Sequence, residues 1–438
     1  MADPGVDRVS APLQVAEVIA VGSELLGSTR LDTNSLFIAR QLALVGIELK
    51  GKSVVGDDRI RLSEVFRQSA ARADVVVISG GLGPTDDDLT REAVADALGL
   101  ELVEDAAITE RIRHRFERRG LQMPEVNRRQ AMVPAGGTAI PNPNGSAPGL
   151  VIPHGDRLAV LLPGPPRELQ PMLIDLCAPD GAIGRRAGTS RLHTVSLFTT
   201  GLSESHVEEL AQPVYSKWRS LPEPIETTIL ATPGQVELHL TLRSAEERRA
   251  KRALEEARAS LVAAIGDAVF GTDGRFLPQV VGDMLRERKL TIAAAESCTG
   301  GLLMQRLTDV PGSSAYVKGG VVAYSDEIKN ELLGVNEAIL AEHGAVSEAV
   351  AAAMVEGIRE RTHASVSVAI TGIAGPDGGT PAKPVGMVVI AILMAGRPLE
   401  VRTHLFPGGR DMVRLQSSQT ALDRIRRMLL ADAPVRRG

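Results

Sequence analysis

Short runs rich in Val and Ile alternate with longer amphipathic stretches through the first and last thirds of this 438-residue chain. This alternation is typical of α/β domains, in which helices cover largely buried sheets. The pattern predicts strands at 17–22, 73–79, 158–162, 291–295, 318–323 and 365–370. It predicts helices at 34–44, 91–98, 302–307 and 326–333.

The middle of the chain has a different pattern. Residues 194–199 and 236–242 alternate between polar and apolar side chains, as strands with one exposed face do, and 246–262 resembles a charged helix with an apolar stripe. At about 150 residues per domain, the length suggests about three domains. We therefore predict two three-layer α/β domains joined by a small α+β module, with bounds at 1–184, 185–276 and 277–438.

Composition argues against several functional classes. Two cysteines, Cys177 and Cys298, cannot build a disulfide framework or a cysteine-rich zinc module, so we expect a cytoplasmic protein. A net charge of −5 and an aromatic content of 3% give no general reason to bind nucleic acid or an anionic membrane. The strongest apolar stretch, 386–395, is about half the ~20 residues that a spanning helix requires, and the first residues do not have the pattern of a secretory signal.

In the last third of the chain, two predicted strands are each followed by a loop whose side chains could act as nucleophiles or bases. In the loop 296–301, Ser297, Cys298 and Thr299 precede a helix whose amides can stabilise an oxyanion, although a helix cap with packing glycines would look the same. After the next strand come Tyr324 and Lys329, the latter in the first turn of a helix. The helix dipole would lower the pKa of a desolvated lysine there, making it a base for a serine, unless both side chains are simply solvated.

A third loop, 371–379, contains four glycines and one proline. Its backbone amides can form a nest for a phosphate or carboxylate, and the guanidinium of Arg410 can clamp a phosphate. Together, the three loops and the arginine favour a small phosphorylated substrate.

Five ordered motifs within about residues 277–430 resemble the CinA C-terminal domain: AESCTGG at 295–301, GGVVAYS at 319–325 with Lys329, GAVS at 344–347, ITGIAGP at 370–376 and KPVG at 383–386. The resemblance implies deamidation of nicotinamide mononucleotide to nicotinate mononucleotide and ammonia, without a cofactor. It implies Ser297 as nucleophile, preferred over Cys298, with Tyr324 and Lys329 activating it. The substrate-binding residues expected here are Thr299, Gly300, Thr371, Gly372, Gly375 and Arg410.

The first third has its own glycine-rich loop, GGLGPTDDDLT at 80–90. Glycines allow the backbone to approach a phosphate, whereas the aspartates that follow would repel it unless a cation such as Mg²⁺ intervenes. The alternative is that these acids only complement a helix N-terminus. Because three consecutive aspartates exceed what a cap requires, we favour a metal.

This loop, together with the turns 22–24, 32–34, 144–149 and 162–168, resembles the molybdopterin-binding-like domain at the N-terminus of CinA, over about residues 15–180. The resemblance implies a divalent-cation-dependent pyrophosphatase acting on ADP-ribose, or a pterin-binding site without hydrolysis. The substrate-binding residues expected here are Glu24, Gly81, Gly83, Thr85 and Asn144. The expected metal-binding residues are Asp87, Asp88 and Thr90.

The middle module resembles the KH-like connecting module of long CinA proteins, but it lacks a GxxG loop and a basic cluster, so we expect no RNA binding. The expected partners are small phosphorylated nucleotides and a second copy of the chain in a homodimer. The family's name also suggests a different class of function, an accessory role in competence or DNA damage that acts through protein partners.

Overall fold

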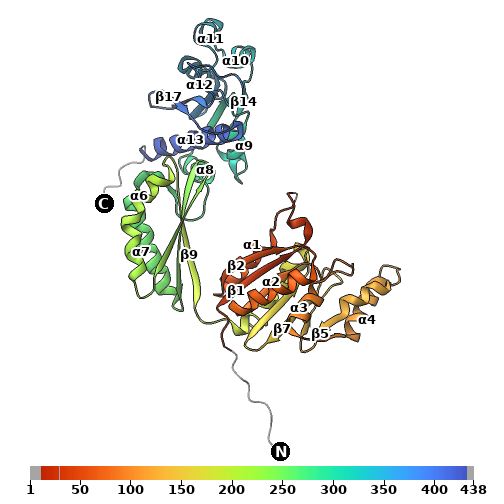
Figure 1. Ribbon diagram of the computed structural model, residues 1–438. Coiled ribbons are helices and arrows are strands. Elements are labelled where there is room, and N and C mark those ends of the chain that lie inside the picture. Colours follow the sequence, from red (N-terminus) through yellow and green to blue (C-terminus); the bar gives the residue numbers. More distant parts are fainter. Residues whose placement is uncertain (1–10, 29, 432–438) are drawn as a thin grey trace, which may run out of the picture. The chain divides into compact units, whose positions relative to one another are not determined.

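The computed structural model describes residues 11–28 and 30–431 and confirms the predicted mixed α/β class (Figure 1). Contacts divide the chain into two compact units. One contains the chain up to His193 together with Arg243–Ala250, and the other contains Thr194–Leu242 and the chain from Lys251 onward. The middle module is thus grouped mostly with the C-terminal part, and the three-domain bounds at 184 and 276 stay a prediction.

The first unit is built on a six-stranded sheet of order β2-β1-β3-β8-β7-β6. Its strands are β1 (Val15–Val21), β2 (Glu48–Val55), β3 (Val75–Ser79), β6 (Thr138–Ile140), β7 (Gly149–His154) and β8 (Arg157–Leu162). A separate antiparallel pair consists of β4 (Leu102–Glu104) and β5 (Met132–Pro134). Strands β2, β1, β3 and β8 are parallel, so their carboxyl ends lie at one edge of the sheet.

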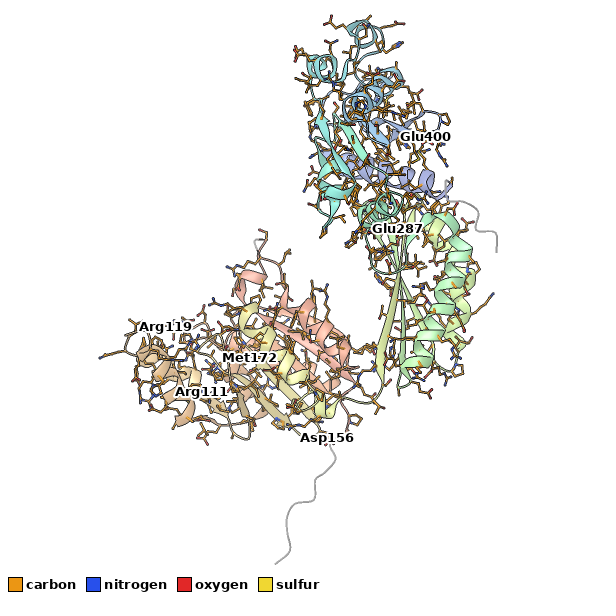
Figure 2. All side chains as sticks on the ribbon, turned by 180° about the vertical axis from the view of Figure 1, so that it is seen from behind. Arg111, Arg119, Asp156, Met172, Glu287 and Glu400 are labelled. Carbon is orange, nitrogen blue, oxygen red and sulfur yellow. The ribbon has the colours of Figure 1, made fainter. Side chains whose placement is uncertain are left out.

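Helices cover both faces of this sheet. They are α1 (Asn34–Leu44), α2 (Arg59–Arg72), α3 (Thr90–Leu98), α4 (Ala106–Glu117) and α5 (Pro166–Cys177). The core on one face includes Phe66 of α2 and Val94 of α3. The core on the other face includes Ile38 of α1 and Met172 of α5, the latter labelled in Figure 2. This is the predicted three-layer arrangement.

The middle module has a four-stranded sheet of order β10-β11-β9-β12. Its elements are β9 (Arg191–Thr199), α6 (Glu204–Tyr215), β10 (Ile225–Thr232), β11 (Gln235–Ser244), α7 (Glu247–Ile265) and β12 (Val269–Gly271). In β11, buried and half-buried residues alternate strictly, which confirms the one-sided strand predicted at 236–242.

The C-terminal part has a five-stranded sheet of order β14-β13-β15-β16-β17. Its strands are β13 (Ile292–Glu296), β14 (Val317–Val322), β15 (Val366–Gly372), β16 (Met387–Met394) and β17 (Glu400–Leu405). Its helices are α8 (Leu277–Glu287), α9 (Leu302–Thr308), α10 (Asp326–Leu333), α11 (Glu337–His343), α12 (Glu348–Thr362) and α13 (Arg410–Ala431).

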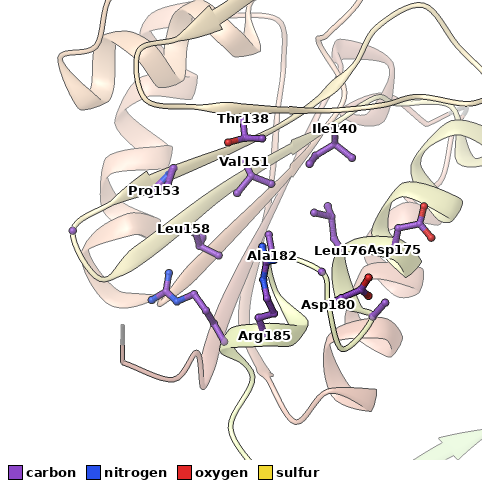
Figure 3. A pocket seen from close by; sticks show the side chains of 14 residues that line it. Thr138, Ile140, Val151, Pro153, Leu158, Asp175, Leu176, Asp180, Ala182 and Arg185 are labelled. Atoms are coloured by element: carbon purple, nitrogen blue, oxygen red, sulfur yellow. The ribbon is translucent and has the colours of Figure 1, made fainter. Parts of the chain in front are cut away.

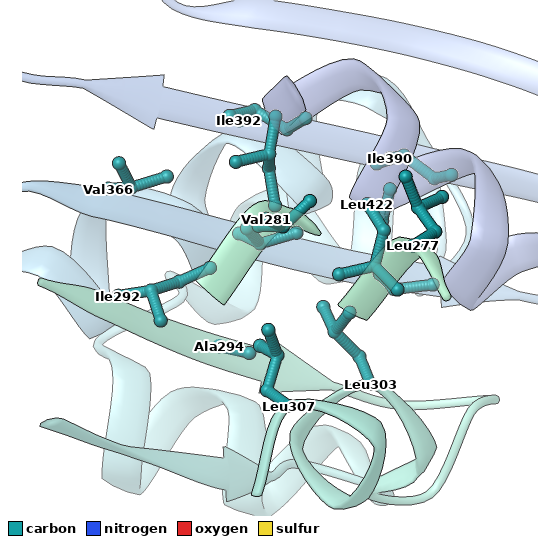
Figure 4. Packing of buried hydrophobic residues seen from close by; sticks show 14 of the residues in the cluster. Leu277, Val281, Ile292, Ala294, Leu303, Leu307, Val366, Ile390, Ile392 and Leu422 are labelled. Carbon is teal, nitrogen blue, oxygen red and sulfur yellow. The ribbon is translucent and has the colours of Figure 1, made fainter. Parts of the chain in front are cut away.

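Two cores enclose this sheet. On one face, side chains of α8, α9 and α13 pack on the strands, among them Val281, Leu303 and Leu422 (Figure 4). The other core includes Val350 and Met354 of α12. Strand β13 is buried between both cores. Its centre consists of three small residues, Ala293–Ala295. Over the described residues, we find no helix that is long and apolar enough to cross a membrane.

Candidate functional site

A pocket of about 460 Å³ in the C-terminal part brings together most of the residues predicted there. Strands β14, β13 and β15 are parallel, so the loops after them meet at one edge of the sheet. The lining includes Ser297 after β13, Tyr324 and Lys329 after β14, and Thr371, Gly372 and Gly375 from the end of β15 and its loop, together with Arg410 at the start of α13.

Ser297 is held by a turn that is fixed at both ends. Its amide donates to Ile370 O of β15 over 2.9 Å, and its carbonyl accepts from Gly300 N over 3.0 Å. The buried carboxylate of Glu296 accepts from Leu303 N and Met304 N, over 3.1 and 2.9 Å. Glu296 therefore ties the end of β13 to the first turn of α9, with the serine between them.

The adjacent Cys298 is a poor candidate nucleophile in this geometry. Burial raises the pKa of its thiol to about 12, against the weaker opposing effect of nearby backbone amides. A thiol in this state carries almost no thiolate at neutral pH, and the thiolate is the reactive form. Of the two neighbouring nucleophiles, the structure therefore favours Ser297.

Lys329 is buried to 1% exposure although its sequence position is the first turn of an exposed helix. Ser325 caps α10, as predicted, by accepting from Ile328 N. The Lys329 ammonium donates to Tyr324 O and to Asp326 Oδ1, both over 3.2 Å. The Lys329 side chain is therefore buried along its length, and its nitrogen lies at the pocket beside the carboxylate of Asp326.

Arg410 connects two of the pocket's loops. Its Nη2 donates to the Tyr324 hydroxyl over 2.9 Å and its Nη1 donates to Gly375 O over 3.0 Å. The hydrogen bond that it donates to Tyr324 raises the pKa of the guanidinium, which is charged at any working pH. Thr371 is buried and donates to Ala345 O over 2.8 Å, so its hydroxyl positions the 344–347 turn.

Two predicted substrate-binding residues lie outside the lining of this pocket. Thr299 is fully buried, and its carbonyl accepts from Arg414 Nε and Nη2 over 3.2 and 2.9 Å. Gly300 follows it at a φ of +59°, a left-handed conformation that suits glycine. The geometry thus gives both residues a supporting place in the Ser297 turn.

The first unit has its own pocket of about 400 Å³, at the carboxyl edge of its parallel strands. Of the predicted residues, it is lined by Glu24, Gly81, Gly83, Asp87 and Asp88, joined by Asp57, Pro163–Pro165 and Glu168. A Cβ at Gly81 would lie 2.2 Å from Thr90 Oγ1, and one at Gly83 would lie 2.3 Å from Asp88 Oδ2. A side chain at either position would require the Thr90 or Asp88 side chain to move.

Thr90, Thr85 and Asn144 do not line that pocket. Thr90 is fully buried and its hydroxyl donates to Gly80 O over 2.8 Å, so in this structure it supports the loop. Thr85 donates to Asp88 Oδ2 from both its amide and its hydroxyl, over 2.9 and 2.6 Å. Asn144 donates from its side-chain amide to Arg167 O over 2.7 Å.

The glycine-rich loop is braced from within by Arg91. This residue is 1% exposed and donates to Leu82 O over 2.8 Å and to Gly83 O over 2.9 Å. Because N–H and C=O of a trans peptide point in opposite directions, the Leu82 carbonyl that faces Arg91 leaves the Gly83 amide on the other side of the peptide from Arg91.

The carboxylates of this pocket suit a hard cation only in part. Oxygen donors such as Asp87 and Asp88 are the ligands Mg²⁺ prefers. Over the described residues, however, we find no group of three or more His, Cys, Asp or Glu side chains placed to hold a metal ion. A cation here would need phosphate oxygens of the ligand and water to complete its coordination.

A larger cavity, of about 600 Å³, contains none of the predicted residues. It lies between strands β6 to β8 and the end of α5, with Val151 and Leu158 on one side and Asp175 and Asp180 on the other (Figure 3). Volume alone therefore does not identify the chemical sites of this chain.

Sequence reasoning missed Glu296, Asp326, Arg91, Asp57 and Glu168. A weak signal existed for Asp326, which lies three residues before Lys329, and for Glu296, which directly precedes the Ser297 turn. Nothing in the local sequence indicates that the arginine at 91 turns inward.

The fold and sites define a class: a mixed α/β protein with two separate polar pockets, each at the carboxyl edge of parallel strands. Two family models match the chain, "CinA C-terminal domain" over residues 275–429 and "Probable molybdopterin binding domain" over residues 17–180. The chain belongs to the CinA family.

Two relatives that align over nearly their whole length show this membership. A CinA-like protein of Koribacter versatilis is 46% identical over 421 residues, covering 95% of this chain and all of the relative. One of Solibacter usitatus is 43% identical over 414 residues, covering 94% and 98%. A crystal structure of a competence-damaged protein (CinA) superfamily protein from Klebsiella pneumoniae is 35% identical, covers 35% of this chain and 96% of that one, and has a TM-score of 0.34.

Proposed function

We propose that the C-terminal part hydrolyses the carboxamide of nicotinamide mononucleotide to nicotinate mononucleotide and ammonia. The observation that supports this proposal is that a single pocket contains the four groups the reaction needs. They are Ser297, Lys329, Tyr324 and Arg410. A nucleophile, proton-transfer groups and an anion clamp are what amide hydrolysis of a phosphorylated substrate requires.

The proposed steps assign one role to each group. Ser297 Oγ attacks the carboxamide carbon while Lys329, acting as a free amine, takes the serine proton, and amides of the surrounding turn stabilise the oxyanion. Tyr324, whose oxygen accepts from Arg410, gives its own proton to the leaving ammonia and regains one from the Lys329 ammonium. Water then attacks the acyl-enzyme, one of its protons restores Ser297, and the other leaves as the product acid ionises to the carboxylate.

The test follows both pyridine products by liquid chromatography together with ammonia release. We expect turnover by the unmodified chain without added metal, and a loss of about 10³-fold or more in Ser297→Ala, as for removal of other catalytic nucleophiles. Full activity in Ser297→Ala contradicts the assignment.

For the first unit we propose cation-dependent hydrolysis of the diphosphate of ADP-ribose to AMP and ribose 5-phosphate. A bound divalent cation would neutralise charge on the phosphoryl oxygens, with Asp87 and Asp88 as its protein ligands. The brace of Arg91 supports the proposal because it leaves the Gly83 N–H on the side of the peptide away from Arg91, and Gly83 lines the pocket. AMP formation with Mg²⁺, its absence in EDTA and its loss in Asp87→Asn are the expected results.

Two alternatives rest on the comparisons. The match to a molybdopterin-binding family model favours pterin binding without hydrolysis, which predicts tight pterin binding and no AMP. A role in competence or DNA damage through protein partners predicts a cellular phenotype that persists in Ser297→Ala and Asp87→Ala chains. A cytoplasmic homodimer is part of the main proposal, and light scattering tests the dimer.

A further inference from the structure

A pocket of about 230 Å³ in the first unit lies outside the sites described above. One of its walls is α4 with the residue that follows this helix, and the other is the loop 142–148, between β6 and β7. Ser146 lines both this pocket and the 400 Å³ pocket of the same unit, so the two cavities are neighbours.

Three arginines from one face of α4 line this pocket. Arg111, Arg115 and Arg118 follow one another at spacings of four and three residues, and Arg111 is labelled in Figure 2. Among the described residues, those that line the pocket include no acidic side chain. We call this cavity the arginine pocket. Like charges at these spacings repel each other and destabilise a helix, so the cluster requires an explanation.

The surrounding structure does not neutralise the three charges. The carboxylates of α4 itself, those of Glu110 and Glu117, pair instead with Arg113 and His114. Of the three pocket arginines, only Arg115 has a side-chain hydrogen bond, to a carbonyl oxygen; within the described part of the chain the other two side chains have no hydrogen bond or ion pair. Because a guanidinium has five N–H donors, most donors of the pocket remain available to a ligand.

The helix dipole does not account for the cluster. Cations in the last turn of a helix interact favourably with its final carbonyls, which is sufficient for Arg115 and Arg118. Arg111 lies in the middle of α4, where this effect has decayed. The helix end carries only about half a negative charge, which three guanidiniums outweigh. The arginine pocket is therefore a site of positive potential.

The wall opposite α4 is held in place by its own hydrogen bonds. Asn142 Oδ1 accepts from Asn144 N over 3.0 Å and from Gly145 N over 2.8 Å, and Asn142 Nδ2 donates to Ala147 O over 2.7 Å. Arg115 Nη2 donates to Asn144 O over 2.9 Å, which ties this loop to α4. The two walls are therefore connected before any ligand binds, and less ordering is needed on binding.

We propose that the arginine pocket binds a phosphoryl group. A guanidinium donates parallel N–H groups to phosphate oxygens, and a phosphoryl group carries a charge of about −1.5 to −2 at pH 7. The volume is below the range of about 300–1,000 Å³ that is typical of pockets for drug-sized ligands, so it suits one compact group and not a whole nucleotide. The group is either a free inorganic anion or the end of a ligand whose remainder lies past Ser146 in the larger pocket.

The neighbouring pocket has the opposite charge. Its lining contains the carboxylates of Glu24, Asp57, Asp87, Asp88 and Glu168. Without a cation these groups repel a phosphoryl group, whereas the arginine pocket attracts one. Binding in EDTA therefore separates the two sites, because the chelator removes the cation that the larger pocket would need.

Modification of arginine by phenylglyoxal tests the site, because a bound phosphoryl group shields the guanidiniums that hold it. The full chain is treated in EDTA at constant ionic strength, with inorganic phosphate or AMP as the probe, and mass spectrometry locates each modified arginine. At saturation we expect modification of Arg111, Arg115 and Arg118 to slow about tenfold or more, and that of Arg119 to stay unchanged. Arg119 is exposed, does not line the pocket and is labelled in Figure 2. Equal slowing at Arg119, or no slowing with either probe, overturns the site.

The two probes also distinguish the two sources of the phosphoryl group. If the nucleoside of AMP adds contacts in the larger pocket, AMP protects at a concentration about tenfold or more below that of inorganic phosphate. That result supports a ligand that spans both cavities. Protection by AMP only at equal or higher concentrations assigns the arginine pocket to a free anion.

Matched variants test the role of charge. Arg111→Gln and Arg118→Gln remove a guanidinium that has no other side-chain hydrogen bond or ion pair to lose within the described chain. We expect each to raise the probe concentration that half-protects Arg115 about fivefold or more. Arg119→Gln removes the same charge one residue further along and should leave this concentration unchanged. Equal values in all three variants contradict the proposal. Neither readout requires hydrolysis of ADP-ribose, so failure of the proposed activity and failure of this site are distinguishable.

Discussion

Arg410 Nη2 donates to the hydroxyl of Tyr324 over 2.9 Å, joining the first residue of α13 to the loop after β14. The same guanidinium reaches Gly375 O, so it orders three segments at once. Lys at this position keeps the charge but cannot form both bonds in a planar fork. We expect Arg410→Lys to raise KM for nicotinamide mononucleotide about tenfold or more and to lower kcat less. Steady-state kinetics check this, with Arg427→Lys on the same helix as a control; a variant that matches the unmodified chain contradicts the clamp.

The thiol of Cys298 should react very slowly with alkylating reagents. Its pKa of about 12 means that the thiolate forms only as the pH approaches 12, so alkylation by iodoacetamide should be very slow between pH 7 and 9. Cys298→Ser should retain deamidation, in contrast to Ser297→Ala. Mass spectrometry of Cys298 across this pH range and parallel assays of the two variants provide the measurement. Rapid alkylation that abolishes activity would show that the thiol is the nucleophile.

Glu296 should matter for stability as well as for activity. Removing its carboxylate in Glu296→Ala leaves the Leu303 and Met304 amides without their acceptor, at a cost of about 2–3 kcal/mol in the free energy of unfolding. Glu296→Gln keeps one acceptor oxygen and should lose less. Urea unfolding of the full chain, followed by far-ultraviolet circular dichroism, compares the free energies of unfolding of the two variants. Equal losses in the two variants would indicate that the negative charge of the carboxylate, and not the side-chain volume or the acceptor oxygen that Gln retains, causes the effect.

Arg91 links the stability of the first unit to its proposed chemistry. Arg91→Met leaves the Leu82 and Gly83 carbonyls buried without a donor and frees the peptide between these two residues to rotate. We expect AMP formation from ADP-ribose to fall by about 10²-fold, while deamidation by the C-terminal part is unchanged. The intact second activity serves as the folding control within the same sample. Unaltered AMP formation in Arg91→Met would show that the hydrogen bonds from Arg91 to the loop are not needed for this activity.

Much of the fold could be predicted because the central strands of the two large sheets are parallel and buried. The predicted helices at 34–44 and 326–333 match α1 and α10 at both ends, and the strands that carry the loops are all present. The parallel order also explains why loops far apart in sequence form one pocket. The argument that favours Ser297 over Cys298 could not be made from residue types, because the raised pKa of the Cys298 thiol depends on its burial in the fold.

The missed residues depend on contacts between distant segments. Arg91 turns inward because two carbonyls of a preceding loop are there to accept its hydrogen bonds, and Thr90 bonds Gly80 for the same reason. The arginine pocket depends on a loop that Arg115 reaches at Asn144, 29 residues further along the chain. Local patterns of hydrophobicity contain no record of such pairings.

The position of α13 also has a consequence for the order in which the protein is made. Ser297, Tyr324, Lys329 and Thr371 all leave the ribosome before Arg410, and α13 supplies Val413, Leu422 and Leu429 to the core beneath them. The nascent chain therefore has the proposed nucleophile and base before it has the proposed clamp or a closed core. Turnover of substrate should begin only once α13 has docked, which makes translation of this helix the step that switches the C-terminal pocket on.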